Sequence, residues 1–400
     1  MANPLIAALE IGSSNTTLLV GEPDANGRMH VEGAGRVTSM GVRKGQIVNF
    51  DHAVQCITQA VGKVTEKKFD VGRVLIAAGG GYIGSFSNHG STPVRSRNQV
   101  VSLDDIEDVR ELAGSVTLPS PTAARMHTIP QKFRLDGQTG IVRPEGLKGT
   151  TLSLGMLVVH AERGPVENLK NAAAAASLDV EDIVFSAYAA SFAVLSQEQR
   201  DAGVAVVDLG GGTTNAMAFV DGVPADAWSI GVGGDHVTND VRSAFSLTQA
   251  QAEQLKRNAS ALVGIHEGPA RLTVAAATPG FDPVTISRRA LETVVNARLQ
   301  ELFAVILDDL DRANLSHRFN GGIVLTGGVT ATPGLPQLAE HVFGRRARVG
   351  TFVSDIVALE DGPAPASYAT VAGLLLTTLR GLEPRGDGNT FKRIFGGLFG

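Results

Sequence analysis

The sequence predicts an α/β protein, because strand-like and helix-like segments alternate along the chain. Short apolar runs rich in β-branched residues end at glycine clusters, the pattern of a buried strand before a tight turn; they are residues 5–9, 204–207 and 323–325. Segments with apolar residues at helical spacing lie between and after them, at residues 52–67, 165–177 and 291–310. This alternation indicates α/β architecture.

The composition is that of an ordinary folded protein, and its length favours about two to three domains. The 400 residues are 43% hydrophobic and 19% charged, with a formal net charge of −5 that offers no basic field for duplex nucleic acid. Cys56 is the single cysteine, which fits a reducing compartment. No signal peptide and no apolar run of roughly 18 to 20 residues is recognisable. A secreted, membrane-spanning or disordered chain is therefore not expected.

Two segments depart from the α/β alternation. Residues 84–159 hold polar turns, a short acidic helix at residues 103–112 and a strand at residues 151–159, which indicates a small α+β insert. Residues 381–390 are polar with Gly and Pro, as in a linker, and an apolar, basic tail follows at residues 391–400.

Three glycine turns carry the candidate chemistry. A strand that ends in an acid, followed by glycine and hydroxyl residues, forms a hairpin whose backbone N–H groups can face phosphate oxygens. The acid can hold a metal-bound water, so Glu10 and Asp208 are the candidate catalytic acids. The candidate phosphate contacts are Gly12, Ser13, Ser14, Asn15, Gly210, Gly211, Gly212, Thr213 and Thr214. The third turn, with Gly327, Gly328 and Val329, is expected to cover the base and sugar.

In this order the motifs resemble those of the actin, heat-shock chaperone and sugar kinase ATPase superfamily. The resemblance implies an actin-like (ribonuclease H-like) two-domain ATPase fold, with ATP and Mg²⁺ as cofactors and the metal held through ATP and water. Residues 252–256 match an AExxK helix, which in bacterial actin-like proteins places its Glu and Lys against the adenosine. Glu253 and Lys256 are the corresponding residues here.

Longer stretches resemble the FtsA family of bacterial cell division proteins, at residues 41–45, 47–49, 127–131, 204–214, 321–328 and 333–335. The insert lies where that family carries its subdomain 1C. The resemblance implies subdomain 1A at 1–83, 162–190 and 361–380, 1C at 84–161, 2A at 191–228 and 312–360, and 2B at 229–311. It also implies self-assembly into protofilaments, contact with other divisome proteins, and a midcell location at the cytoplasmic side of the inner membrane.

The tail is expected to be an amphipathic membrane anchor. Its apolar residues repeat at helical spacing and two cations flank them for anionic lipids: Phe391, Ile394, Phe395, Leu398 and Phe399, with Lys392 and Arg393. So short a segment should fold only on a surface, and many copies on one filament would multiply its weak binding. The alternative is that the tail packs on its own domain.

Three positions favour slow hydrolysis of ATP. Glu10 is one methylene longer than the usual Asp, and Asn15 stands where many members have Lys. Ser186 aligns with the acidic residue by which rod-shape actins position the attacking water. Loss of such a group costs about 10²- to 10⁴-fold in rate. The expectation is ATP binding with slow or negligible turnover.

Partner binding is implied by the resemblance alone. In the FtsA family, basic residues of the segment around 288–298 receive the C-terminal peptide of the tubulin-like protein FtsZ, so Arg298 and, less directly, Arg289 are the candidates. Two alternatives stay open: a pilus-assembly actin homologue of the PilM type, which lacks such a tail, and a small-molecule kinase of the same fold. A chaperone is not expected, because a peptide-binding β-domain is missing.

Overall fold

The computed structural model describes residues 5–65, 69–265, 268–276, 282–357 and 365–379. Its first half is built on a six-stranded sheet with the strand order β11-β6-β1-β2-β3-β19. The three leading strands form antiparallel hairpins, and β6 runs parallel to β1. The strands are β1 (Ile6–Ile11), β2 (Asn15–Pro23), β3 (Met29–Thr38), β6 (Arg73–Ala78), β11 (Asp179–Phe185) and β19 (Ile356–Val357).

The second half repeats this plan on a five-stranded sheet with the order β14-β13-β12-β17-β18. Again three strands form antiparallel hairpins, and the following strand of the sheet, β17, runs parallel to the first, β12. The strands are β12 (Val204–Leu209), β13 (Thr214–Val220), β14 (Val223–Ile230), β17 (Ile323–Thr326) and β18 (Ala347–Val349). The chain is therefore a structural duplication.

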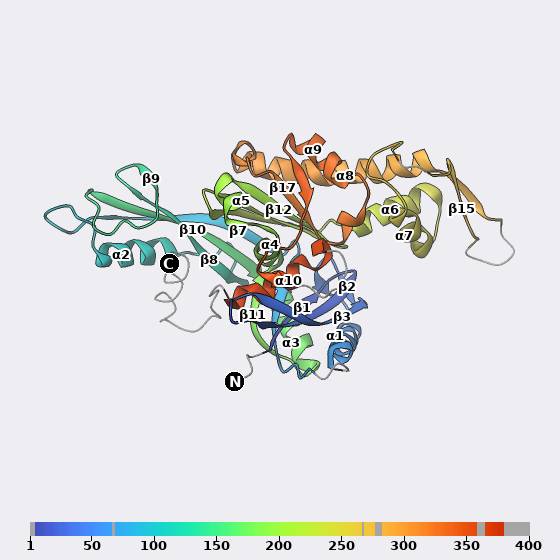
Figure 1. Cartoon of the computed structure of the whole chain (residues 1–400), viewed down its shortest axis with the longest axis horizontal. Coiled ribbons are helices and arrows are strands. Elements are labelled where there is room, and N and C mark those ends of the chain that lie inside the picture. Colours follow the sequence, from blue (N-terminus) through green and yellow to red (C-terminus); the bar gives the residue numbers. More distant parts are fainter. Residues whose placement is uncertain (1–4, 66–68, 266–267, 277–281, 358–364, 380–400) are drawn as a thin grey trace.

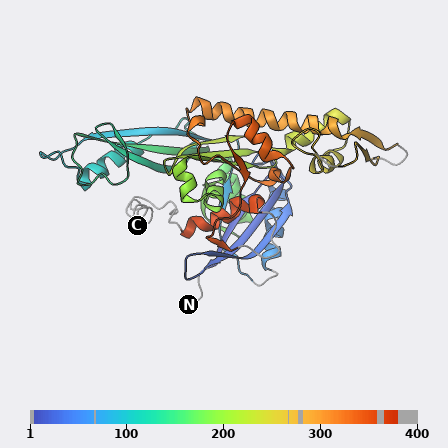
Figure 2. The ribbon, with the colours of Figure 1, turned by 45° about the horizontal axis from the view of Figure 1, so that its top comes forward.

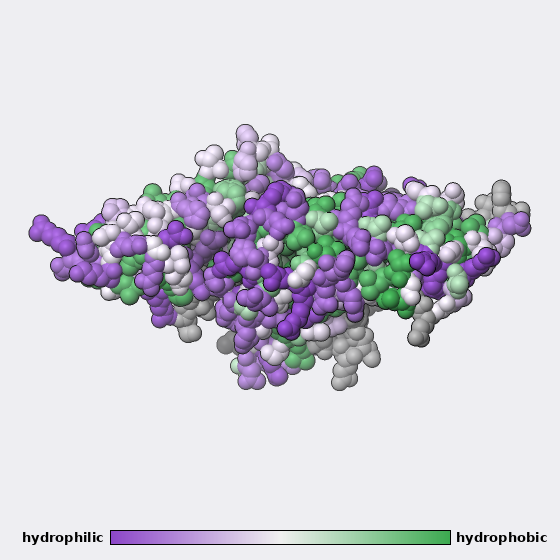
Figure 3. All heavy atoms as spheres, turned by 90° about the horizontal axis from the view of Figure 1, so that it is seen from above, coloured by the Kyte–Doolittle hydropathy of each residue, from purple (hydrophilic) through white to green (hydrophobic). Residues whose placement is uncertain are grey.

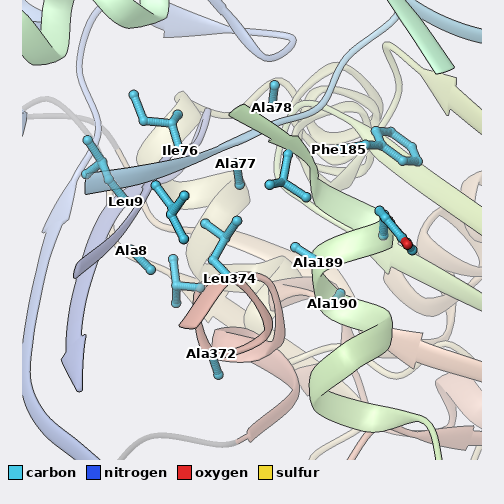
Figure 4. Close-up of a cluster of buried hydrophobic side chains, with 14 of the residues drawn as sticks. Ala8, Leu9, Ile76, Ala77, Ala78, Phe185, Ala189, Ala190, Ala372 and Leu374 are labelled. Atoms are coloured by element: carbon cyan, nitrogen blue, oxygen red, sulfur yellow. The ribbon is translucent and has the colours of Figure 1, made fainter. Parts of the chain in front are cut away.

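Two helices pack against each other between the halves. They are α4 (Ser186–Val194), which is buried along its whole length, and α10 (Ala369–Leu379). Gly373 of α10 lies so close to the backbone of Ala189 that any side chain at Gly373 would collide with it. Figure 4 shows small side chains of α4 and α10 beside β1 and β6. Alanine and glycine thus let the helices approach closely.

Further helices, one hairpin and short 3₁₀ turns belong to the two halves. The first half carries α1 (Phe50–Thr65) and α3 (Arg163–Ala175), and the small hairpin of β4 (Val42–Arg43) and β5 (Gln46–Ile47). The second half carries α5 (Gln197–Ala202) and α9 (Leu335–Phe343). Short 3₁₀ turns stand at η1 (Ser316–Arg318), η2 (Gly328–Ala331) and η3 (Pro365–Tyr368).

The insert projects from one end of the molecule as a separate four-stranded sheet with the order β7-β10-β8-β9 (Figure 1). Its apolar core lies between this sheet and one helix, which begins with a capping box formed by Ser102 and Asp105. The elements are β7 (Ile83–Pro93), α2 (Leu103–Gly114), β8 (Ala123–Leu135), β9 (Gln138–Ile141) and β10 (Thr151–Glu162).

A helical lobe forms the opposite end. Its longest element is α8 (Arg288–Arg312), which runs along one side of the molecule in Figure 2. When the molecule is seen from above, hydrophilic residues cover much of its surface (Figure 3). The other elements are α6 (Gly234–Phe245), α7 (Gln249–Arg257), β15 (Arg271–Val274) and β16 (Val284–Ser287). Within the described ranges, no helix combines the length and apolarity that crossing a membrane requires.

The strands and helices expected from the sequence are present, with shifted ends. The run at 204–207 extends to Leu209 in β12, and the helix expected at 291–310 begins at Arg288 and ends at Arg312. The helix expected at 52–67 begins earlier, at Phe50. Terminal residues of an element carry the weakest sequence signal, because capping and packing fix them.

Candidate functional site

Two rows of paired side chains, one from each sheet, contribute residues to the cleft between the halves. In the first half Glu10 of β1 pairs with Ala77 of β6 and Thr17 of β2, and Thr17 pairs with Arg36 of β3. Residues directly opposite each other on neighbouring strands point to the same face, so these four side chains form one row. All four line the cleft.

The second half repeats the row at equivalent positions. Asp208 of β12 pairs with Thr326 of β17 and Asn215 of β13, and Asn215 pairs with Ser229 of β14. Thr326 Oγ1 lies 3.3 Å from Asp208 Oδ1, and Ser229 Oγ donates to Asn215 Oδ1 at 2.6 Å. Glu10 and Asp208 are therefore counterparts in the duplicated fold.

The two phosphate-type loops are built alike and touch each other. Gly12 N donates to Asn15 O at 3.0 Å, and Gly210 N donates to Thr213 O at 2.9 Å, which closes each turn. A side chain at Gly211 would collide with Ser14, and one at Gly212 with Ser13. The loops therefore approach each other closely at these two glycines. Residues of both loops line one cleft.

That cleft has a volume of about 590 Å³, which suits a nucleotide-sized ligand. Most of the residues predicted from the sequence line it together: Glu10, Gly12, Ser13, Ser14, Asn15, Asp208, Gly210, Gly211, Thr213, Glu253, Lys256, Gly327, Gly328 and Val329. Thus 14 of the 16 predicted nucleotide-site residues, from four separate stretches of the chain, meet in one place.

Two predicted phosphate contacts do not line the cleft. Gly212 packs against Ser13 and the backbone N of Lys44, behind the loop contact. Thr214 is buried in β13, where its Oγ1 donates to Val232 O at 2.9 Å. Thr214 points away from the cleft because a strand turns alternate side chains to opposite faces.

The two acidic groups hold their protons more tightly than usual. Burial, and then the nearby Asp208 charge, raise the pKa of Glu10 to about 8, although Arg36 opposes the shift. Burial also raises the pKa of Asp208 to about 6, against hydrogen bonds from Thr326, Asn215 and Thr370. Two carboxyl groups that share an enclosed space resist joint ionisation. They fit a divalent cation, which would neutralise both.

The second half supplies a polar wall through α7. Glu253 and Lys256 lie one turn apart and form an ion pair with 2.6 Å between Glu253 Oε2 and Lys256 Nζ. Thr238 Oγ1 donates to the same Glu253 oxygen at 2.6 Å, and Lys256 Nζ donates to Gly234 O at 3.2 Å. Contacts within the second half therefore hold both predicted side chains, Glu253 and Lys256, in place.

The place expected for a water-activating acid holds neutral groups. Ser186, the first residue of α4, is buried and lines the cleft, and its Oγ has no hydrogen-bond partner among the described residues. Asn215 stands near it, since both would contact a side chain at Gly79. Neither a serine nor an amide side chain accepts a proton readily at neutral pH.

The two candidate partner-binding arginines differ in their surroundings. Arg289 is exposed on α8. Arg298 is paired twice within the lobe, at 2.5 Å between its Nε and Asp240 Oδ2 and at 2.7 Å between its Nη1 and Glu301 Oε2. A partner carboxylate at Arg298 would compete with Asp240. The predicted membrane residues, Phe391 to Phe399, lie outside the described residues.

Several cleft residues were missed by sequence reasoning. Thr17 and Arg36 belong to the first row, and Thr370 of α10 contributes a hydroxyl 3.5 Å from Asp208 Oδ2. Thr17 could have been found by folding the Glu10 strand over the glycine turn, which places it opposite Glu10. Arg36 and Thr370 have no local motif. Among the described residues, no cluster of three or more His, Cys, Asp or Glu side chains could bind a metal ion by itself.

The duplicated sheets, the shared cleft and the central helices define an actin-like fold with a small inserted domain. Solved structures agree. The "PilM-PilN type IV pilus biogenesis complex" aligns with a TM-score of 0.64 at 15% identity, over 94% of this chain and 98% of that one. MreB5 of Spiroplasma citri bound to ADP aligns with a TM-score of 0.58 at 14% identity, over 93% and 95% of the two chains.

Sequence comparisons are more specific than the fold. The model of the family "Cell division protein FtsA" matches residues 205–373, and "SHS2 domain inserted in FTSA" matches residues 80–160. The cell division protein FtsA of Pseudomonas aeruginosa is 32% identical over 386 residues, which cover 96% of this chain and 91% of the relative. The chain belongs to the FtsA family of cell division proteins. An actin-like ATPase family implies nucleotide binding.

Proposed function

We propose that this chain binds ATP and Mg²⁺ in the cleft, polymerises on the cytoplasmic face of the cell membrane and tethers the FtsZ ring at the division site. One observation carries the nucleotide part: two glycine loops, each following a carboxyl group with a raised pKa, meet at a single cleft. Membership of a family of cell division proteins supports the rest. The subdomain boundaries given above are part of the proposal.

Mg²⁺ would neutralise phosphate charge and would be held by water bound to Glu10 and Asp208. The protein's own contribution is to exclude solvent and orient the phosphates through the loop N–H groups. The neutral side chains of Ser186 and Asn215 beside the cleft support slow turnover. Nucleotide then acts as a structural switch. Steady-state hydrolysis faster than about 1 per second would contradict this part of the proposal.

Membrane attachment is proposed from the tail sequence. Five apolar residues at helical spacing and the cations Lys392 and Arg393 form an amphipathic pattern at residues 391–399. An anchor this short binds weakly as a monomer, so filament formation should strengthen attachment through avidity. Recruitment of further divisome proteins and a midcell location are proposed from membership of the family alone.

Co-sedimentation with anionic liposomes, with and without ATP, tests the proposal. The intact chain is compared with one that ends at Arg380 and with a Phe395→Glu variant of full length. We expect the intact chain to pellet with liposomes in the presence of ATP and both altered chains to stay in the supernatant. Equal binding by all three would remove the tail from the membrane function, and binding by none would favour the tail packing on its own domain.

FtsZ tethering is proposed to involve Arg289 and Arg298. Binding of a synthetic FtsZ C-terminal peptide should fall at least about tenfold for Arg289→Glu, because a charge-assisted contact is replaced by repulsion. Arg242→Glu, an exposed arginine on α6 of the same lobe, is the matched control. Asp240→Asn removes one of the two ion pairs of Arg298 and leaves the pair with Glu301, so it should increase affinity for the peptide. No change in any variant would place the peptide elsewhere.

Two alternative functions are separated by simple assays. A pilus-assembly scaffold of the PilM type has the same fold, as the TM-score of 0.64 supports, but should neither bind the FtsZ peptide nor need the tail. A small-molecule kinase would form a phosphorylated product from ATP and an acceptor, which thin-layer chromatography with labelled ATP would detect. The neutral side chains of Ser186 and Asn215, which lie together near Gly79, argue against the kinase.

A further inference from the structure

Arg36 is a positively charged residue that lines the cleft but lies outside the glycine motifs. It stands on β3 at the end of the first row, two strands from Glu10, and it lines the cleft with a partly buried side chain. Thr17 separates Glu10 from Arg36 in that row. Because threonine is short, the long arginine side chain can extend over it into the space in front of Glu10.

The guanidinium of Arg36 is held by stacking and not by an anion. Its Cζ lies 5.1 Å from the centre of the Tyr368 ring, directly before α10. Across the described part of the chain, the Arg36 guanidinium forms no ion pair with a carboxylate and donates no hydrogen bond. Arg28, Arg298 and Arg312, by contrast, each pair with an aspartate. Stacking on an aromatic ring fixes the orientation of a guanidinium and leaves its N–H donors available.

The charges around Arg36 favour the binding of an anion beside the first loop. Arg36 is close enough to Glu10 to oppose the upward shift of that residue's pKa, yet it does not pair with it. The first loop itself carries no cation, because Asn15 and the two serines are neutral. A phosphate chain lying along this loop would therefore gain from Arg36 a positive charge that the loop side chains do not supply.

We propose that Arg36 binds the phosphate chain of the nucleotide and supplies the positive charge that the first loop lacks. The inference rests on the proposed nucleotide function and adds to it a binding residue that no glycine motif contains. A planar guanidinium binds two phosphate oxygens at once, so it orients the chain as well as attracting it. Arg36 is thus a binding residue of the first half, opposite Lys256 of the second half.

Equilibrium binding of ATP, ADP and adenosine to the full chain tests the inference. We compare the native protein with Arg36→Gln, Arg36→Lys and the control Arg125→Gln, which removes an exposed charge from the insert. Arg36→Gln should weaken ATP and ADP binding by about tenfold or more, the equivalent of about 1.4 kcal/mol, while adenosine affinity stays within about twofold. Arg36→Lys should regain part of the loss, and Arg125→Gln should match the native protein.

The outcomes separate the inference from the proposed function. If the native protein binds no nucleotide, the proposed function itself is wrong. If the native protein and Arg36→Gln bind ATP equally well, only the role of Arg36 is wrong. An equal loss for ATP and adenosine would mean that the substitution deforms the cleft, and would also overturn the inference. Adenosine binding serves as the internal check that the variant is folded.

Discussion

At the scale of single residues, the cleft contains buried polar groups that a bound ligand would stabilise. Glu10 and Asp208 lie in the enclosed space between the two sheets, and burial raises the pKa of each. Ser186 leaves a buried hydroxyl without a partner among the described residues. Such groups are rare in cores, where polar atoms are almost always satisfied. Their concentration at one cleft marks it as a site for a charged, hydrogen-bonding ligand.

The raised pKa of Glu10 has a direct consequence for stability. An acid whose pKa is about 8 in the folded protein and 4.5 ordinarily binds its proton more tightly when folded. Without Mg²⁺ and nucleotide, the free energy of unfolding should therefore fall as pH rises from about 5 to about 8, by up to about 1.4 kcal/mol per pH unit. Denaturant unfolding at several pH values measures this slope, and Glu10→Gln should flatten it. An equally steep slope in Glu10→Gln would assign the effect to other groups.

At the scale of elements, α4 and α10 determine how closely the two halves approach. Small residues line their contact, and Gly373 sits against the backbone of Ala189. Helix packing at this distance tolerates no added methyl group without a shift of one helix. Because α10 also brings Thr370 to Asp208, a shift of α10 would reach the cleft.

A pair of glycine substitutions tests this packing. Gly373→Ala should lower the free energy of unfolding by about 1 to 3 kcal/mol, because the new methyl group collides with Ala189. Gly62→Ala is the matched control, since Gly62 of α1 has no atom within 4 Å of the added methyl group and alanine favours helices. It should stabilise by up to about 1 kcal/mol. Equal effects in chemical denaturation would show that α4 and α10 have room to separate.

The sequence predicted much of these elements, and its failures have a common cause. The acid–glycine–hydroxyl pattern picks out Glu10, Asp208 and loop residues that line one cleft, because each motif is local in the chain. Gly212 and Thr214 belong to the same pattern but do not line the cleft, because a local pattern does not show how a turn or strand is oriented in the fold. Arg36 and Thr370 were missed altogether, since each reaches the cleft through strand register or helix packing.

At the scale of the whole molecule, the cleft lies between the two halves while the insert lies apart at one end (Figure 1). The insert still contacts the second half. Ser85 Oγ of β7 donates to Asp226 Oδ1 at 2.6 Å. Just before the insert, Gly80 N donates to Ser229 Oγ at 2.9 Å. Ser229 is bonded in turn to Asn215 of the second row. Ligand binding should therefore order both halves at the cleft and leave the far end of the insert unchanged.

Hydrogen exchange with and without ATP and Mg²⁺ measures this distribution. We expect slower amide exchange at residues 12–15 and 210–213 and in α7, and no change in α2 or β9. At a nucleotide concentration of about 100 times Kd, binding should also raise the free energy of unfolding by about 2.7 kcal/mol. Protection confined to the insert would place the ligand outside the cleft, and uniform protection would point to self-assembly during the measurement.

The sequence by itself determined the α/β class, the two acid–glycine loops, the shared helix face of Glu253 and Lys256 and the position of the insert, because each depends on residues that are close together in the chain. Only the tertiary structure decided that Thr17 and Arg36 stand in a row with Glu10, that Arg298 is bound to Asp240, and that Ser186 meets Asn215 near Gly79. These relations join strands and helices through register and packing. Their physical basis is contact between residues far apart in the chain, which no local pattern encodes.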